Sequence, residues 1–146
     1  MVERSADRAG DAAEVEAANA EFYVAFESAD LDTMSDLWLV DEETLCVHPG
    51  ALPVRGTPAI NRSWALIMAN TPYIQFFLTD VEVSVLGDVA SVTCTENVLT
   101  ADEMTEDESF NGAKAVATNV FVRTGDDWRL WIHHASPVLS GEHHED

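Results

Sequence analysis

The chain has 146 residues, enough for one domain with a hydrophobic core and too few for two, and its 47% of hydrophobic residues exclude general disorder. Its formal net charge of −20, from 27 acidic and 7 basic residues, repels phosphate backbones and anionic membrane surfaces. Nucleic-acid and membrane partners are therefore not expected.

The cysteines and the N-terminal residues indicate a cellular compartment. Residues 1–10 lack the apolar segment of a signal peptide, and no window is apolar for long enough to cross a bilayer. Cys46 and Cys94 fall in apolar, strand-like runs without a CxxC spacing. We therefore expect two buried, reduced thiols in a cytoplasmic protein.

Helical periodicity dominates the first half of the chain. Residues 1–10 are polar and are expected to form a flexible N-terminus. Apolar side chains then recur every three or four positions over residues 11–28, which predicts a long amphipathic helix. A shorter helix is predicted over residues 30–38, and a third over residues 58–70, where proline suits the first turn. A short strand over residues 44–48 lies between them.

Beyond residue 72 the hydrophobic period changes to two, which indicates strands. They are predicted over residues 73–86, 89–100, 112–123 and 128–137, and Asp80 is expected to be a bend or bulge within the first of them. Glycine-containing turns join them into a run of antiparallel hairpins.

Helices followed by strands favour an α+β fold, with three N-terminal helices packed on one face of a curved, mostly antiparallel sheet. The acidic run over residues 101–111 is expected to be a solvated hairpin tip, and residues 139–146 a flexible C-terminal tail. A single domain is therefore predicted over residues 11–138.

Polar side chains on otherwise apolar strand faces are the first candidates for a functional site, because a cavity lined by such a face would present them to a ligand. Glu96 shares a face with Val92 and Cys94. A buried carboxylate without a cation has a raised pKa, which suits general acid or base catalysis, unless an inner hydrogen bond makes it purely structural. Asn119 shares a face with Phe121, where it would either orient a substrate carbonyl or fix a bulge.

The last predicted strand ends in two adjacent histidines. Alternation puts His134 on the same face as Trp128 and leaves His133 on the opposite face, against a second subunit. His134 is then a cavity residue, or a hydrogen-bonded core histidine if that face is plain core. Together with His48 and Glu96, it would support an elimination, an isomerisation or a water addition by proton transfer.

Other chemistries lack their sequence signals. Two histidines and a glutamate are ligand types of an iron or zinc site, but no HxE, HxD or HExxH spacing is present. A GxSxG nucleophile turn and a glycine-rich phosphate loop are also absent. The sequence therefore predicts neither a metal site nor a cofactor.

Several motifs together resemble one known family. They are the turn Val47-His48-Pro49-Gly50 leading to Gly56, Trp64 on the third helix, and the final run from Gly125-Asp126-Asp127-Trp128-Arg129 to His134-Ala135-Ser136. Over residues 12–138 this pattern resembles the SnoaL-like branch of the nuclear transport factor 2-like superfamily.

The resemblance implies a cone-shaped barrel whose helices and concave sheet enclose a pocket, commonly in a homodimer formed through the sheet. Members include ketosteroid isomerases, scytalone dehydratase, polyketide cyclases, limonene epoxide hydrolase and the non-catalytic association domain of calcium/calmodulin-dependent kinase II. The resemblance places Glu96, Asn119 and His134 in the pocket and His48 at the strand end that closes it. The Asp and Tyr pair of the isomerases and the Asp-Arg-Asp set of the epoxide hydrolases have no match in this chain.

We therefore predict a cytoplasmic homodimer that acts by proton transfer, without a cofactor, on a small and mostly apolar molecule. His134 and His48 are the predicted base and acid, and Glu96 polarises or orients one of them. Asn119 is predicted to hold a substrate oxygen. The predicted apolar wall consists of Tyr23, Trp38, Trp64 and Phe121. The rival hypothesis is a module that binds a ligand or assembles without chemistry.

Overall fold

The computed structural model describes residues 2–101 and 110–139, and this part of the chain folds into three helices and six strands. The helices are α1 (Val2–Glu27), α2 (Leu31–Leu37) and α3 (Thr57–Ala69). The strands are β1 (Leu45–Val47), β2 (Val54–Arg55), β3 (Ile74–Leu86), β4 (Val89–Ala101), β5 (Phe110–Thr124) and β6 (Asp127–Pro137). The predicted α+β class is confirmed. None of the described helices is both long and apolar enough to span a membrane.

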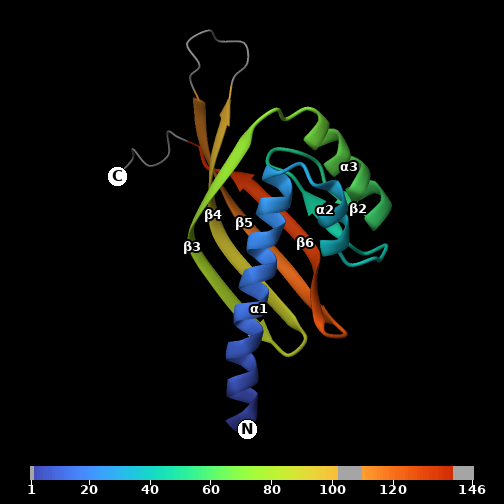
Figure 1. The fold of residues 1–146 in the computed structure, drawn as a ribbon, viewed down its shortest axis with the longest axis vertical. Helices are drawn as coiled ribbons and strands as arrows, with labels where there is room; N and C mark the ends of the chain where they lie inside the picture. The colour runs from blue at the N-terminus through green and yellow to red at the C-terminus, as the bar shows by residue number, and fades with distance from the viewer. Residues whose placement is uncertain (1, 102–109, 140–146) are drawn as a thin grey trace.

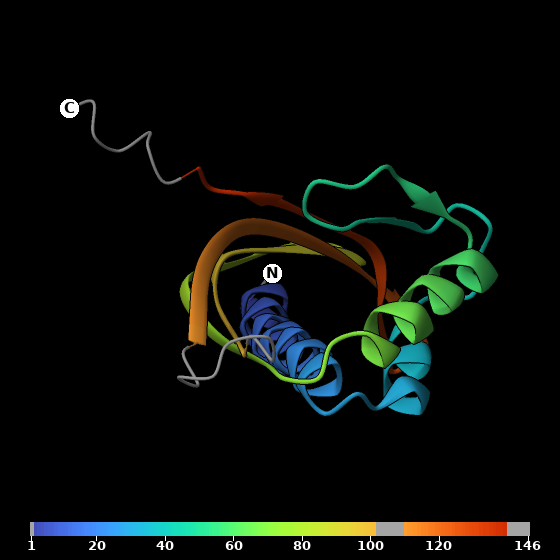
Figure 2. The same cartoon turned by 90° about the horizontal axis from the view of Figure 1, so that it is seen from above.

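All six strands form one sheet in the order β2-β1-β6-β5-β4-β3 (Figure 1). Neighbouring strands are antiparallel except β1 and β6, which are parallel. The sheet is open, and it curves around α1, which lies against its concave face (Figure 2). The predicted curved, mostly antiparallel sheet with helices on its concave face is therefore confirmed. The two-residue strand β2 was not predicted, because its segment is too rich in proline and glycine to show a strand pattern.

Helix α1 begins at Val2, earlier than the predicted start at residue 11. Its buried face contains Val15, Phe22 and Ala25, which pack against the concave sheet face. At its end, Ala29 adopts a left-handed conformation with φ of 53°, and this stops the helix. Asp30 then caps α2 by accepting a hydrogen bond from the backbone amide of Thr33, as its position before the apolar turn predicts.

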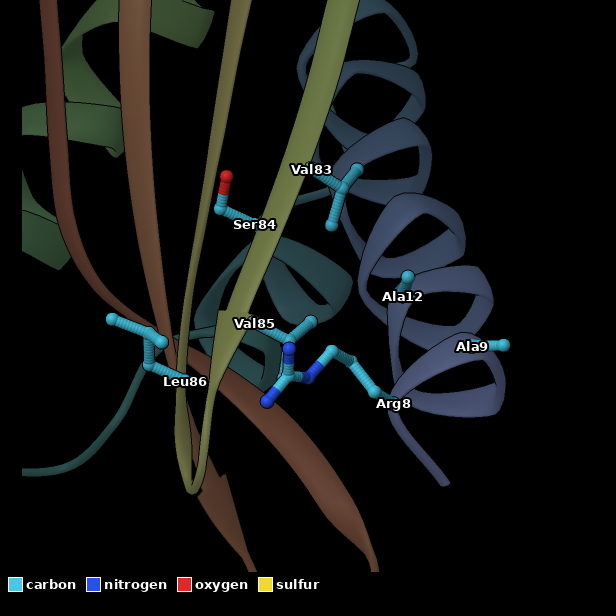
Figure 3. A pocket seen from close by; sticks show the side chains of 7 residues that line it. All are labelled: Arg8, Ala9, Ala12, Val83, Ser84, Val85 and Leu86. Carbon is cyan, nitrogen blue, oxygen red and sulfur yellow. The ribbon is translucent and has the colours of Figure 1, made fainter. Parts of the chain in front are cut away.

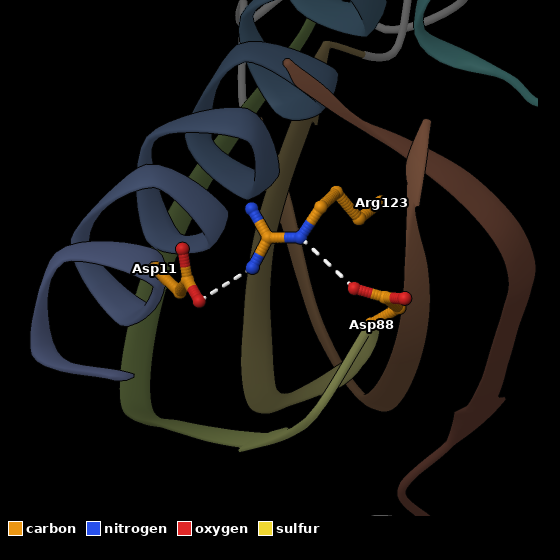
Figure 4. Close-up of polar contacts among 3 residues, drawn as sticks. All are labelled: Asp11, Asp88 and Arg123. Carbon is orange, nitrogen blue, oxygen red and sulfur yellow. Dashed lines mark hydrogen bonds and ion pairs between the residues drawn. The ribbon is translucent and has the colours of Figure 1, made fainter. Parts of the chain in front are cut away.

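Arg123, near the end of β5, joins three parts of the molecule (Figure 4). Its guanidinium group donates to Asp11 of α1 at 2.5 Å and to Asp88 of the β3–β4 turn at 3.1 Å. It also lies over the Trp128 ring of β6, 4.5 Å from the ring centroid. The pair with Asp88 is exposed and adds little to stability, whereas the partly buried pair with Asp11 holds α1 across one end of the sheet.

A β-bulge interrupts the pairing of β5 with β6. Val120 pairs with Ile132, but the next residue, Phe121, pairs with Leu130, so Trp131 has no partner residue on β5. An extra residue of this kind reverses the alternation of faces beyond it. In β6, Leu130 lies on the concave face before the bulge. After the bulge, the residues on that face are the odd-numbered His133 and Ala135.

The bulge exchanges the places of the two histidines. His133 is buried on the concave face, with 4% of its surface exposed, whereas His134 is exposed on the convex face. The prediction that His134 occupies the cavity face and His133 the opposite face is therefore wrong. The error arises because strict alternation from Trp128 was assumed across a strand that contains one extra residue.

Candidate active site

A cavity of about 340 Å³ lies between α1, α3 and the concave face of the sheet. This volume is at the lower end of the roughly 300–1,000 Å³ range of small-molecule sites, and it suits a molecule of one or two rings. Its wall is mainly aromatic and aliphatic. Besides Tyr23, three ionisable side chains with shifted pKa values also line it. These are His48, Glu96 and His133.

The aromatic wall is built on one face of α1. Helical spacing places Phe22 and Phe26 one turn apart, and both rings contact Trp64 of α3 edge-on, with centroids 5.5 and 4.9 Å away. Tyr23 and Phe26 contact Phe76 of β3 at 5.0 and 5.1 Å. Rings that hold one another in this way form a rigid apolar surface against which a ligand can pack.

Glu96 lies at the base of this wall, with only 4% of its surface exposed. The Tyr23 hydroxyl donates a hydrogen bond of 2.6 Å to its Oε2 atom. Burial raises the pKa of Glu96, and the hydrogen bond from Tyr23 offsets part of that rise. The pKa of Tyr23 is also raised, by burial and then by the charge of Glu96, so Tyr23 remains a donor. In the described part of the chain, Oε1 of Glu96 has no hydrogen-bond partner.

Asn119 links Glu96 to His133 behind the cavity wall. Its amide nitrogen donates to Oδ1 of Asn19 at 2.7 Å and to the Tyr23 hydroxyl oxygen at 3.3 Å. Its Oδ1 atom lies 2.6 Å from Nδ1 of His133. Because Tyr23 uses its proton on Glu96, its oxygen accepts from Asn119, and the amide oxygen must face His133. His133 therefore carries its proton on Nδ1 and donates to Asn119.

His133 is held as a neutral imidazole. The pKa of His133 is lowered to about 3, mainly by burial and to a smaller extent by the nearby His48 and His134. Its ring lies 4.8 Å from Phe22, between centroids, and it lines the cavity. With Nδ1 protonated, Nε2 has a lone pair, and no hydrogen bond to Nε2 is found among the described residues. This nitrogen is available to a ligand.

His48 follows β1 and forms part of the same wall. Its ring meets Trp64 edge-on at 4.8 Å and lies 6.5 Å from the ring of His133. Its Nε2 lies 3.2 Å from Ser63 Oγ and 3.6 Å from the Cys46 sulfur. Partial burial lowers the pKa of His48.

The predicted site residues occupy three kinds of position. Those in the cavity wall are Tyr23, His48, Trp64 and Glu96. Those buried in the core or behind the wall are Trp38, Asn119 and Phe121. Asn119 thus orients side chains of the site and does not line the cavity, and His134 faces away from it.

Two residues of the hydrogen-bond network escaped prediction. His133 was assigned to the other face, and Asn19 was not considered. Asn19 lies on the apolar face of α1, one turn after Val15 and one turn before Tyr23, and only 1% of it is exposed. A search for polar residues on apolar faces would have identified it had the search included the helix as well as the strands.

A wider groove of about 660 Å³ lies between the start of α1 and the end of β3 (Figure 3). Among the side chains that the structure describes here, Arg8 is the one ionisable group, and the others are Ala9, Ala12 and residues 83–86. These described side chains include no acid–base pair. Nor does any group of three potential metal ligands occur within residues 2–101 and 110–139.

Comparison with known proteins identifies the family. The model of the SnoaL-like domain matches residues 15–140, which is most of the chain. The chain belongs to the SnoaL-like family. The predicted resemblance to this branch of the nuclear transport factor 2-like superfamily is thereby confirmed. No functionally curated protein matches this SnoaL-like chain significantly.

Solved structures similar to this SnoaL-like chain differ in their described roles. A Streptomyces avermitilis protein, described as a "putative dehydratase" of the NTF2-like family, is 50% identical, with a TM-score of 0.84 over 90% of this chain and 99% of that one. A Thiobacillus denitrificans protein, described as a "putative calcium/calmodulin-dependent protein kinase type II association domain", is 31% identical, with a TM-score of 0.74 over 85% of this chain and 94% of that one. An NTF2-like superfamily protein from Salmonella enterica serovar Typhimurium, 18% identical, shares the fold, with a TM-score of 0.76 over 91% and 94%.

Proposed function

We propose that this SnoaL-like protein binds a small, mostly apolar molecule in the 340 Å³ cavity and dehydrates it by proton transfer, without a cofactor. One observation carries the proposal: Glu96 and His133 line the same cavity and are joined behind it through Asn119 and Tyr23. The network uses Oε2 of Glu96 and Nδ1 of His133, and it leaves Oε1 of Glu96 and Nε2 of His133 to the ligand. The description of the 50% identical Streptomyces protein as a "putative dehydratase" supports this choice.

A β-hydroxy ketone is the simplest substrate for these groups, because its carbonyl makes the neighbouring C–H bond acidic. Glu96 takes that proton, and its raised pKa makes it a stronger base than an ordinary carboxylate. The electrons of the C–H bond form a C=C bond as the C–O bond of the hydroxyl group breaks. The hydroxyl leaves as water with the proton from Glu96, and Nε2 of His133 accepts its other hydrogen in a hydrogen bond that fixes its orientation.

His48 is the second residue proposed to exchange protons with the ligand. Burial lowers its pKa and raises that of Glu96, so their proton affinities are closer than in water. Isomerisation would use the same first step, with Glu96 returning the proton to a different carbon. The same groups would also serve a cyclisation of the polyketide cyclase type.

Dehydration of 3-hydroxyindan-1-one to indenone, followed by absorbance, tests the proposal with a two-ring β-hydroxy ketone. We expect the protein to accelerate the reaction over buffer and over an equal concentration of serum albumin. The His134→Gln variant is the matched control, because this residue lies on the convex face, and it should retain the wild-type rate. Binding of this compound and other β-hydroxy ketones without conversion of any would contradict the proposal.

That contradictory result would favour a module that binds or assembles without chemistry. The 31% identity to a protein described as a kinase association domain supports this second candidate. In either case we propose a cytoplasmic homodimer formed through the convex sheet face, where Val116 is 46% exposed. The proposed compartment rests on the sequence pattern, and Cys46 and Cys94 are both buried and unbridged, as that proposal requires.

A further inference from the structure

Hydrogen-bond donors and acceptors are distributed unevenly around the cavity. We infer that its substrate carries at least two hydroxyl or N–H donors, as a polyhydroxylated molecule of one or two rings does, because the polar side-chain atoms presented to it are acceptors. The inference rests on the proposed function, since it takes this cavity as the substrate site. It adds the class of molecule that the cavity selects. 3-Hydroxyindan-1-one, with a single hydroxyl, is then a minimal test substrate that should bind more weakly than a molecule with two donors.

The first acceptor is Nε2 of His133. The network that starts at the Glu96 carboxylate fixes its direction: Tyr23 donates to Glu96, Asn119 donates to Tyr23, and His133 donates to Asn119. Asn19 accepts the second amide hydrogen of Asn119, so a flipped amide would place two oxygens together. The single proton of His133 is therefore held on Nδ1, behind the wall, and Nε2 presents a lone pair.

The second acceptor is Oε1 of Glu96. Tyr23 occupies Oε2, and no side chain in the described part of the chain donates to the other oxygen. Because all the donors of Tyr23 and Asn119 are already used, neither residue can offer a hydrogen to the ligand without breaking a buried bond.

His48 adds a third acceptor by the same reasoning. The hydroxyl of Ser63 donates to the carbonyl oxygen of Ile60 at 2.8 Å, so its oxygen accepts from Nε2 of His48 at 3.2 Å. The proton of neutral His48 is then on Nε2, and Nδ1 has the lone pair. Among the described residues, the one hydrogen-bonding group near Nδ1 is the Cys46 sulfur, 3.9 Å away, a weak donor at a long distance.

Two donors near the cavity do not change this balance. Lys114 is among the residues that line the cavity, but it is exposed, and strand alternation from the buried Ala115 places its side chain on the convex side of the sheet. The indole N–H of Trp64 is enclosed by protein atoms and makes no hydrogen bond. Neither group offers a donor to the open volume of the cavity.

A ligand with only ether or carbonyl oxygens would displace water from these acceptors and leave them unpaired. Each buried group left without a partner costs about 1–3 kcal/mol, whereas a hydroxyl restores the bond. The cavity therefore selects among apolar ligands by the number of hydrogen-bond donors that each ligand carries. A site with unmatched polar groups rejects analogues that lack the complementary group.

Three probes with the same ring system test the inference: naphthalene-2,3-diol, 2-naphthol and 2-methoxynaphthalene, each titrated by calorimetry against the wild-type protein. We expect affinity to fall in that order, by about tenfold for each donor lost. In a Glu96→Gln variant the amide oxygen accepts from Tyr23 and the NH₂ group replaces Oε1. The preference for the diol over the methoxy compound should then fall about tenfold.

The outcomes separate this inference from the proposed function. Equal binding of all three probes would overturn the inference whether or not 3-hydroxyindan-1-one is dehydrated. The expected ranking without any dehydration would support the inference and overturn the proposed function. Failure of every probe to bind would overturn the inference, because a two-ring molecule fits the volume, and turnover of 3-hydroxyindan-1-one would still decide the proposed function separately. The wild-type ranking needs no variant, so misfolding of Glu96→Gln cannot obscure it.

Discussion

The Glu96→Gln substitution is expected to lower kcat for dehydration of 3-hydroxyindan-1-one by about two to four orders of magnitude, the usual effect of losing a general base. Glutamine preserves the shape of the side chain and the hydrogen bond from Tyr23, but it cannot take the substrate proton. Initial rates over a range of substrate concentrations would show the loss in kcat. The matched His134→Gln variant should differ from wild type by less than about twofold, because His134 lies on the convex side of the sheet, away from the cavity.

Stability provides the control for folding. Burial raises the pKa of Glu96, so the native state holds a proton on this residue more tightly than the unfolded state does. The stability from this proton is present at low pH and is lost as the pH rises through the raised pKa. Glu96→Gln should therefore unfold at a higher temperature than wild type at about pH 7, with a smaller difference at about pH 4. An unchanged kcat in a folded Glu96→Gln protein would contradict the assigned role.

The Asn119→Leu substitution is expected to lower the free energy of unfolding by about 3–5 kcal/mol. Leucine has a similar volume, but it leaves Oδ1 of Asn19 and Nδ1–H of His133 without partners in a fully buried region. Each unpaired buried group costs about 1–3 kcal/mol, and neither can reach water. Urea denaturation followed by tryptophan fluorescence would measure the change.

Asn97→Leu is the matched control on the same sheet. Asn97 of β4 donates to the carbonyl oxygen of Phe77 at 2.8 Å and to Thr79 Oγ1 at 3.0 Å, but these bonds are exposed to solvent. Water can replace them, so the same substitution should cost less than about 1 kcal/mol here. Equal losses in the two variants would contradict the view that the network around Asn119 is essential because it is buried.

Local patterns in the sequence were enough to predict most of the fold. Helical and strand periodicity identified the three helices and the four long strands. They also identified Asp80 as a bend or bulge, and the structure gives it a left-handed φ of 55° and a register shift beside it. The prediction that Glu96 lies on the buried face of β4 was correct because the pairing of β4 with β5 is continuous along the strand. These features depend on neighbouring residues alone.

The missed features depend on contacts between distant segments. Trp131 is an extra residue only when β6 is aligned with β5. The bulge that puts His133 on the concave face and His134 on the convex face is therefore not visible in the sequence of β6 alone. The sequence holds a weak sign of it, because Leu130, Trp131 and Ile132 are three consecutive apolar residues and do not alternate. The hydrogen bond between Asn19 and Asn119 joins residues 100 positions apart. Its geometry follows from the packing of α1 on β5.

The protonation state of His133 tests the central claim most directly, because the proposed chemistry and ligand class both require an unprotonated Nε2 that faces the cavity. Nitrogen-15 NMR of histidine-labelled protein distinguishes the two neutral tautomers and the charged form, and a His133→Gln variant assigns the signal. The account predicts a neutral ring with its proton on Nδ1 throughout about pH 5–8, since burial lowers the pKa of His133 to about 3. Titration near the ordinary value of 6.5, or a proton on Nε2, would contradict it.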